Sequence, residues 1–198
     1  YQTLEQYDLA IMQFKRALKL EEELNNKLGL AINHQNIGHC LEEKGDLEGA
    51  LENYRKSLAY NEEIDSDIGR VICKNSLAQI YLKQDMPYLA LVLLEPLQDE
   101  AKKIGDFSIT SLVYINTGWA LTKLENYEDA EYHIQEGLQM AQNRNIPSNI
   151  VYAYEKMSDL EKTRGDYKQA YEFYKKANKY DKQISSATNL RYMNDIIV

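Results

Sequence analysis

The stretch GDLEGALENYRKSL, residues 45–58, is nearly repeated as GDYKQAYEFYKKAN at residues 165–178. The alanine inside this phrase recurs with a period of forty residues: Ala10, Ala50, Ala90, Ala130 and Ala170. Four positions after each alanine stands a large apolar or aromatic residue: Phe14, Tyr54, Leu94, Ile134 and Tyr174. A fixed period of this length is typical of stacked repeats. The sequence therefore predicts an array whose units share a core that no single unit could build alone.

A second column of small residues lies twelve positions before the last four alanines: Gly38, Ala78, Gly118 and Ser158. In residues 28–45, LGLAINHQNIGHCLEEKG, apolar and small side chains recur at helical spacing, which predicts an amphipathic helix. Gly45 can end that helix, and the carboxylate of Asp46 can cap the next one. Each unit is therefore predicted to be a helical hairpin.

Similar pairs of residues, which can end one helix and begin the next, recur along the chain. Inside later hairpins these pairs are Gln84-Asp85, Glu125-Asn126 and Gly165-Asp166. Between hairpins the polar joints are Asn25-Asn26, Asp65-Ser66, Gly105-Asp106 and Asn145-Ile146-Pro147. Short joints of this kind keep consecutive helices antiparallel and adjacent.

The composition limits the classes of partner. The chain has 31 acidic and 23 basic residues and a formal net charge of −8. Such a surface repels a nucleic-acid backbone, so we expect no direct nucleic-acid binding by this segment. We also expect no membrane insertion, because no apolar run approaches the ~20 residues that a span needs. Two cysteines without the spacing of a staple weakly favour a reducing compartment, so the cytoplasm is slightly favoured. Nothing at the start resembles a signal peptide, but the periplasm stays open, because Tyr1 indicates an excerpt whose upstream signal could have been removed.

The sequence shows no pattern of a catalytic, cofactor-binding or metal site. The histidines His34 and His39 are five residues apart, which does not place them on one helical face. Cys40 and Cys73 lack the short spacing of a staple or zinc site. Phosphate-binding, dinucleotide-binding and nucleophile-elbow motifs are not found in the sequence. We therefore expect no enzymatic role, no cofactor and no metal.

The repeat columns resemble the tetratricopeptide repeat over essentially the whole chain. Gly38, Leu41, Ala50, Tyr54 and Ser57 fit its motif in one unit, and matching residues recur in the next three. The resemblance implies an all-α, right-handed superhelical solenoid of antiparallel helix pairs, called A and B, with about four full repeats and partial repeats at both ends. It assigns residues 1–25 to helix B of a truncated repeat and 26–65, 66–105, 106–145 and 146–184 to full repeats. Residues 185–198 then start a further or linker helix.

The forty-residue period is longer than the usual 34 of that family. Arrays of this longer type are similar to the sensor and regulatory regions of bacterial signalling proteins. The resemblance implies that each helix A lines a concave groove that binds a protein or peptide. The expected groove residues are Gln35, His39, Ile72, Asn75, Gln79, Lys83, Leu112, Ile115, Trp119, Lys123, Tyr152, Glu155 and Asp159.

Three of these residues have an alternative interpretation. The amides of Gln35 and Asn75, at matching positions, can clamp a peptide backbone, or they are solvated polar residues on helices. Trp119 is the only tryptophan. It is either an anchor for a partner or part of the ordinary core.

Two functions remain open. The first is a protein- or peptide-binding scaffold in the sensory or regulatory region of a bacterial signal-transduction or transcription-regulating protein. The second is a passive assembly scaffold that does not switch. Neither end has a polar cap, so a homodimer through the ends is also possible. Pro96 should bend its helix near Val92.

Overall fold

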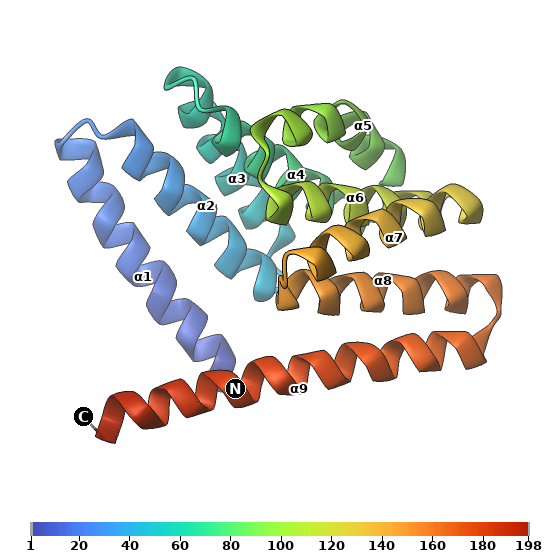
Figure 1. The fold of residues 1–198 in the computed structure, drawn as a ribbon. Helices are drawn as coiled ribbons and strands as arrows, with labels where there is room; N and C mark the ends of the chain where they lie inside the picture. Colours follow the sequence, from blue (N-terminus) through green and yellow to red (C-terminus); the bar gives the residue numbers. More distant parts are fainter. Residues whose placement is uncertain (1, 198) are drawn as a thin grey trace. The chain divides into compact units, whose positions relative to one another are not determined.

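The structure is a computed structural model that describes the backbone of residues 2–197 and the side chains of residues 4–186. Within that range every regular element is an α-helix (Figure 1). The chain divides into two compact units, residues 1–104 and 105–198, here named the N-unit and the C-unit. Each unit is described by itself.

The N-unit contains five helices. Their bounds are α1 (Gln2–Glu23), α2 (Lys27–Glu43), α3 (Leu47–Glu63), α4 (Asp67–Lys83) and α5 (Pro87–Ile104). Each helix packs against the next one along the chain, and α2 also touches α4. Helices α2 and α4 are the first helices (A) of the predicted hairpins, and α3 and α5 are the second helices (B). Helix α5 continues through Pro96 without interruption.

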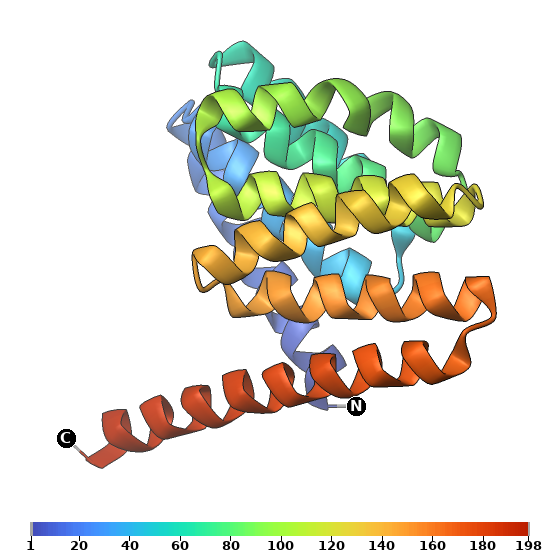
Figure 2. The same ribbon diagram turned by 45° about the vertical axis from the view of Figure 1, so that its right-hand side comes forward.

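The C-unit contains four helices. Their bounds are α6 (Phe107–Lys123), α7 (Tyr127–Asn143), α8 (Pro147–Arg164) and α9 (Tyr167–Ile197). Neighbouring helices again pack in order, and α6 touches α8 more extensively than α2 touches α4. Helix α9 has 31 residues and continues well past its pairing with α8 (Figure 2). Residues 185–197, expected to start a further or linker helix, instead extend α9 without a turn.

Every turn between helices contains one residue in the left-handed backbone region, and these residues follow one another at intervals of twenty: Asn25, Gly45, Asp65, Asp85, Gly105, Glu125, Asn145 and Gly165. This conformation ends a helix by letting the next backbone N–H groups bond back to its last carbonyls. Glycine, asparagine and aspartate adopt it with little strain, and they hold seven of these positions. The even spacing of the turns is what makes all hairpins nearly the same length.

Most predicted caps are present. Asp46 Oδ1 accepts a hydrogen bond from the Gly49 N–H at 3.0 Å, and Asp106 and Asp166 act in the same way on their helices. Asn126 is an exception, because its Nδ2 donates to Asp129 Oδ2 at 2.8 Å and its side chain accepts no capping bond.

The repeat columns form the core. Ala50, Ala90 and Ala130 are fully buried, as are Leu94 and Ile134 four residues after their alanines. Glycine is required at Gly118, because a Cβ there would lie only 2.8 Å from the Ala130 carbonyl oxygen and would meet the Ile134 side chain. The small residues of the Gly118 column therefore leave space for the large residues of the Ile134 column. This packing explains why both columns have the same period.

Candidate ligand-binding groove

The residues that we expected to line a groove all lie on the A helices: α2 and α4 in the N-unit, α6 and α8 in the C-unit. The forty-residue period puts equivalent side chains on equivalent faces of these helices, because each A helix starts at the same point of its repeat. The structure brings some of these residues together around a cavity or a ring cluster and moves others into the core.

In the N-unit, Gln35 is held by its own chain. Its Nε2 donates to Ser76 Oγ at 2.9 Å, and its Oε1 accepts from the thiol of Cys73 at 3.4 Å. Asn75 is buried, with 8% of its surface exposed. The sequence left two interpretations of Gln35 open: a solvated residue or a clamp for a peptide backbone. In the structure its amide instead links α2 to α4.

The neighbouring residue Asn36 has an amide that remains available. It is half-buried, and among the described residues it has no hydrogen-bond partner. An amide of this kind can both donate to and accept from a peptide backbone. Sequence reasoning missed Asn36 because the helical face was placed one residue too early.

An apolar cavity of about 240 Å³ lies between α2 and α4 beside these amides. Leu28, Ile32 and Ile68 surround its mouth and are each about half exposed. Ile72, a predicted groove residue, also lines it. Leu28 and Ile68 were not predicted, although they stand forty residues apart at equivalent positions of two repeats.

The remaining N-unit predictions lie farther along the same helices. His39 is exposed and Gln79 is half-buried. Lys83 forms an ion pair with the buried Glu42, with 2.7 Å between Nζ and Oε1. Its charge is therefore neutralised within the protein, which reduces its value as a ligand contact.

In the C-unit, one prediction is wrong. Ile115 is fully buried and packs with Ala130, Ile134 and Met157 in the core. It belongs to the inner face of α6 because α7 and α8 both cover that face. Leu112, three residues earlier, is half-buried and stays a candidate.

Trp119 lies in a cluster of aromatic rings and lysines. It is half-buried, and the Nζ of Lys156 lies 4.0 Å from its ring centroid, with the Nζ of Lys123 at 6.0 Å. Lys156 is also 5.3 Å from the ring centroid of Tyr152. Such cation–π contacts order the lysine over the rings. Lys156 was not predicted; it directly follows the predicted Glu155 on α8.

The hydroxyl of Tyr152 is already bonded, because it donates to Asn116 Oδ1 at 2.6 Å. This bond joins α8 to α6. Glu155 and Asp159 are exposed, and Asp159 pairs with Lys156 at 3.1 Å. In the C-unit, Trp119, Tyr152 and Asp159 are thus engaged with other side chains, chiefly Asn116 and Lys156.

No chemistry beyond binding is indicated by the described residues. In that part of the chain no three His, Cys, Asp or Glu side chains gather in a way that could hold a metal ion. Both cysteines are buried and unpaired, and burial raises the pKa of the Cys73 thiol. A thiol of raised pKa is mostly protonated at neutral pH and is a poor nucleophile. None of the helices described is both long and apolar enough to span a bilayer.

Comparison with known proteins agrees with this architecture. Tetratricopeptide-repeat models match residues 1–63 and residues 150–184. A search of curated proteins found no match to the sequence.

Solved structures of similar fold include apo RapI, with a TM-score of 0.76 and 19% identity over 92% of this chain and 64% of that one. A Rap protein complexed with Competence and Sporulation Factor has a TM-score of 0.77 and 18% identity over 89% of this chain and 49% of that one. BtubC from P. vanneervenii has a TM-score of 0.69 and 17% identity over 91% and 75%. The chain therefore spans about two thirds and about half of the two Rap proteins, and at these identities the likeness is one of fold: an all-α helical repeat solenoid.

Proposed function

We propose that this chain, which matches tetratricopeptide-repeat models at residues 1–63 and 150–184, is a scaffold that binds a protein or an extended peptide on its A helices. We further propose that it serves as the sensory or regulatory region of a bacterial signal-transduction or transcription-regulating protein. In this role a bound ligand changes the arrangement of the repeats, and an attached domain responds to that change. The remaining A-helix candidates, Leu112 and Trp119 above all, extend the binding surface in the C-unit.

The observation that carries the proposal is the open apolar cavity on the A helices of the N-unit. Its mouth exposes large aliphatic side chains beside the unpaired amide of Asn36. Exposed apolar surface of this kind is rare on proteins unless a partner covers it, and amides beside it suit a peptide backbone. The solved Rap protein complexed with Competence and Sporulation Factor supports a bound partner by analogy of fold.

Selection from a library of random linear peptides tests the binding function. We expect immobilised protein to enrich related peptides, and we expect these peptides to change the fluorescence of Trp119 on titration. Trp119 is a suitable reporter because it is the only tryptophan and is only half-buried. Failure to enrich any peptide above the bare matrix would contradict the proposal.

Small-angle scattering with and without a selected peptide tests the regulatory part. A regulatory solenoid changes its scattering profile on binding, because its repeats change their mutual arrangement. An unchanged profile at saturating peptide would instead support a scaffold that binds without switching.

A specific feature of α5 favours passive assembly as a second candidate function. Met86, Tyr88, Leu89 and Val92 expose 45%, 74%, 50% and 70% of their surface. The other B helices have mostly charged or polar residues in the same columns. Tyr88, for example, corresponds to Glu48, Glu128 and Lys168. An apolar outer face on one helix of an otherwise polar series indicates a contact with a second copy of the chain.

Sedimentation velocity over a range of concentrations tests this alternative. The four side chains offer less than the ~800 Å² per partner of a standard interface, so we expect self-association only at micromolar or higher concentration. The double variant Leu89→Lys and Val92→Glu should abolish it. Tyr132→Glu, in the column of Val92 and 56% exposed, is the matched control and should leave it intact. A wild-type chain that stays monomeric throughout would rule this assembly out.

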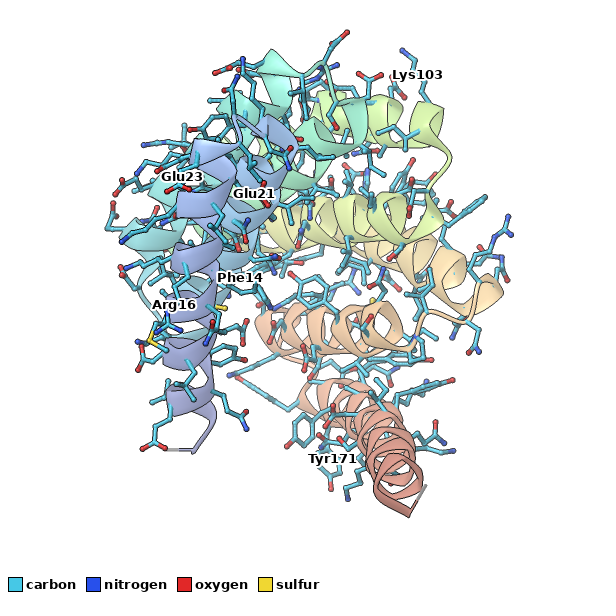
Figure 3. The ribbon with its side chains drawn as sticks, turned by 90° about the vertical axis from the view of Figure 1, so that its left-hand side faces the viewer. Phe14, Arg16, Glu21, Glu23, Lys103 and Tyr171 are labelled. Carbon is cyan, nitrogen blue, oxygen red and sulfur yellow. The ribbon has the colours of Figure 1, made fainter. Side chains whose placement is uncertain are left out.

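The expected homodimer through the chain ends is a separate possibility. On α1, Leu9 and Leu20 are about 60% exposed, and on α9 Tyr167, Tyr171 and Tyr174 are all more than half exposed (Figure 3 labels Tyr171). If the ends associate, Leu9→Glu should weaken self-association while the α5 double variant should not. The same sedimentation experiment therefore distinguishes the two modes.

A further inference from the structure

We propose that the cavity between α2 and α4 is a socket for one large, uncharged apolar side chain of the bound peptide. We name it the α2/α4 socket and define it by Leu28, Ile32, Asn36, Ile68 and Ile72. This inference rests on the proposed peptide-binding function and adds to it the chemical class of residue that the N-unit recognises.

The size of the socket suits a side chain better than a free small molecule. Its volume is about 240 Å³. Pockets for drug-sized ligands are usually about 300–1,000 Å³, and a water molecule occupies about 30 Å³. The socket therefore holds one leucine- to tyrosine-sized group and leaves the rest of a ligand outside, as an extended peptide requires.

The lining of the socket carries no charge. None of its twelve residues is Asp, Glu, Lys or Arg, although 27% of the chain is charged, so about three would be expected by chance. A charged side chain would lose its hydration there without gaining a partner, which is strongly unfavourable. The socket therefore excludes charged side chains.

Several polar groups at the floor of the socket are already bonded within the protein. Ser57 Oγ donates to the Ala31 carbonyl at 2.7 Å, and Asn61 Nδ2 donates to the Ser57 carbonyl at 2.9 Å. The Cys73 thiol lies 3.1 Å from Ser57 Oγ. Because these donors are engaged, the bottom of the socket favours apolar atoms.

In the C-unit, two side chains of α8 bridge the equivalent space to α6. There Tyr152, on α8, reaches α6 and donates to Asn116 at 2.6 Å. Asn149 bridges the same two helices, with its Nδ2 2.9 Å from the Ser108 carbonyl and 2.8 Å from Ser111 Oγ. These side chains close the gap between the two A helices of the C-unit.

In the N-unit the same repeat columns hold smaller residues. Ile72 stands in the column of Tyr152, Gly69 in that of Asn149, and Asn36 in that of Asn116. The gap thus stays open, and the amide that is bonded in the C-unit is left without a partner in the N-unit. An incoming peptide can supply both missing parts: a side chain for the space and a backbone group for Asn36.

Peptide selection with matched variants tests the socket. Peptides are selected on the wild-type chain and their affinities measured on Ile72→Tyr, Ile32→Lys and Ile104→Tyr. Ile72→Tyr fills the socket with the residue that the C-unit uses in that column. Ile104→Tyr makes the same substitution at the end of the B helix α5, outside the socket and the predicted groove, and is the control. Ile32 is 51% exposed, so Ile32→Lys is compatible with folding, which circular dichroism verifies for all three variants.

We expect wild-type selection to enrich Leu, Ile, Met, Phe or Tyr at one peptide position. Ile72→Tyr should weaken binding of these peptides by about tenfold or more, since burial of one such side chain contributes at least that factor. Ile104→Tyr should change affinity less than about threefold. Repeated selection on Ile32→Lys should replace the apolar preference at that peptide position with Asp or Glu. The chain has a net charge of −8 and repels acidic peptides, so such a change would be due to the new lysine.

Two results would overturn the inference in distinguishable ways. If peptides bind but Ile72→Tyr and Ile32→Lys leave both affinity and preference unchanged, the socket is not used, and the peptide-binding function survives. If no peptide is enriched on the wild-type chain, the proposed function itself fails and the socket fails with it.

Discussion

At the scale of single residues, a group of three polar side chains, two of them buried, joins α2, α3 and α4. The hydroxyl of Tyr54, a residue that is 1% exposed, donates a hydrogen bond to Glu42 Oε2 at 2.6 Å. The second carboxylate oxygen of Glu42 is 2.7 Å from Lys83 Nζ. Burial, together with the negative charge of Glu42, raises the pKa of Tyr54 far above its usual value near 10. The hydroxyl therefore stays protonated in the folded chain at any pH at which the chain is stable.

This shifted pKa predicts a loss of stability in alkali. In the unfolded chain Tyr54 ionises above about pH 10, whereas in the folded chain it cannot. The unfolded state then binds fewer protons than the folded state, so the free energy of unfolding falls as pH rises above about 10. Urea titrations at pH 8 and above pH 10 should show a larger drop for the wild-type chain than for Tyr54→Phe.

Tyr54→Phe should also be less stable than the wild-type chain at pH 8. Removal of the hydroxyl deprives a buried carboxylate of a hydrogen bond, and we expect a loss of about 1.5–3 kcal/mol in the free energy of unfolding. Tyr88→Phe is the control, because Tyr88 is 74% exposed and should follow the wild type at both pH values. Equal alkaline losses in the wild type and in Tyr54→Phe would show that Tyr54 is not responsible.

At the scale of elements, each hairpin depends on a close approach between its two helices. Gly118 on α6 faces the backbone of α7, where a Cβ would lie 2.8 Å from the Ala130 carbonyl oxygen and 3.0 Å from the Ile134 nitrogen. Backbone atoms cannot move aside as a flexible side chain can. The small-residue column is therefore a condition for hairpin packing, which the repeat period alone does not explain.

Gly118→Ala should destabilise the chain by about 1–3 kcal/mol, because overpacking forces α6 and α7 apart. Thermal and urea unfolding would measure the effect. Gly29→Ala is the matched control. The three atoms nearest to its added Cβ all belong to the carboxylate of Glu21, in the last turns of α1 (Figure 3), and that flexible group can swing away. This control should be neutral or stabilising, since alanine favours a helix more than glycine does. A neutral Gly118→Ala would contradict the packing argument.

At the scale of the whole molecule, the chain is organised as two compact units with cores of their own. In repeat proteins most interactions are between neighbours, so stability can differ along the chain. Leu94 in the N-unit and Ile134 in the C-unit occupy the same repeat column, and both are fully buried. They offer matched positions for weakening one unit at a time.

Ile134→Ala should cost about 2–5 kcal/mol locally and lower hydrogen-exchange protection more in the C-unit than in the N-unit. Leu94→Ala should show the opposite pattern. Tyr174→Ala, in the same column but 53% exposed, should have little effect on either. Mass spectrometry of exchanged peptides would measure the pattern. A uniform loss of protection in both units after either core substitution would mean that they unfold as one.

The sequence by itself determined the helical hairpins and the period. Left-handed turns every twenty residues and small residues every forty are local requirements of backbone conformation and packing, so they can be read from residue type and spacing. The resemblance to the tetratricopeptide repeat placed the candidate site on the A helices. Neither the spacing nor the resemblance could place individual side chains. Consecutive residues of a helix point in directions about 100° apart, and Gln35 and Asn36 are separated by one such step.

Only the tertiary structure decided which of these residues are buried or bonded and which stay available. Ile115 became core because α7 and α8 both cover it, and Gln35 became a link between helices because Cys73 and Ser76 lie opposite. The α2/α4 socket exists because Ile72 and Gly69 are too small to bridge two helices that Tyr152 and Asn149 bridge in the C-unit. A cavity is a property of several segments at once. It follows from how the helices pack, and no single stretch of sequence contains it.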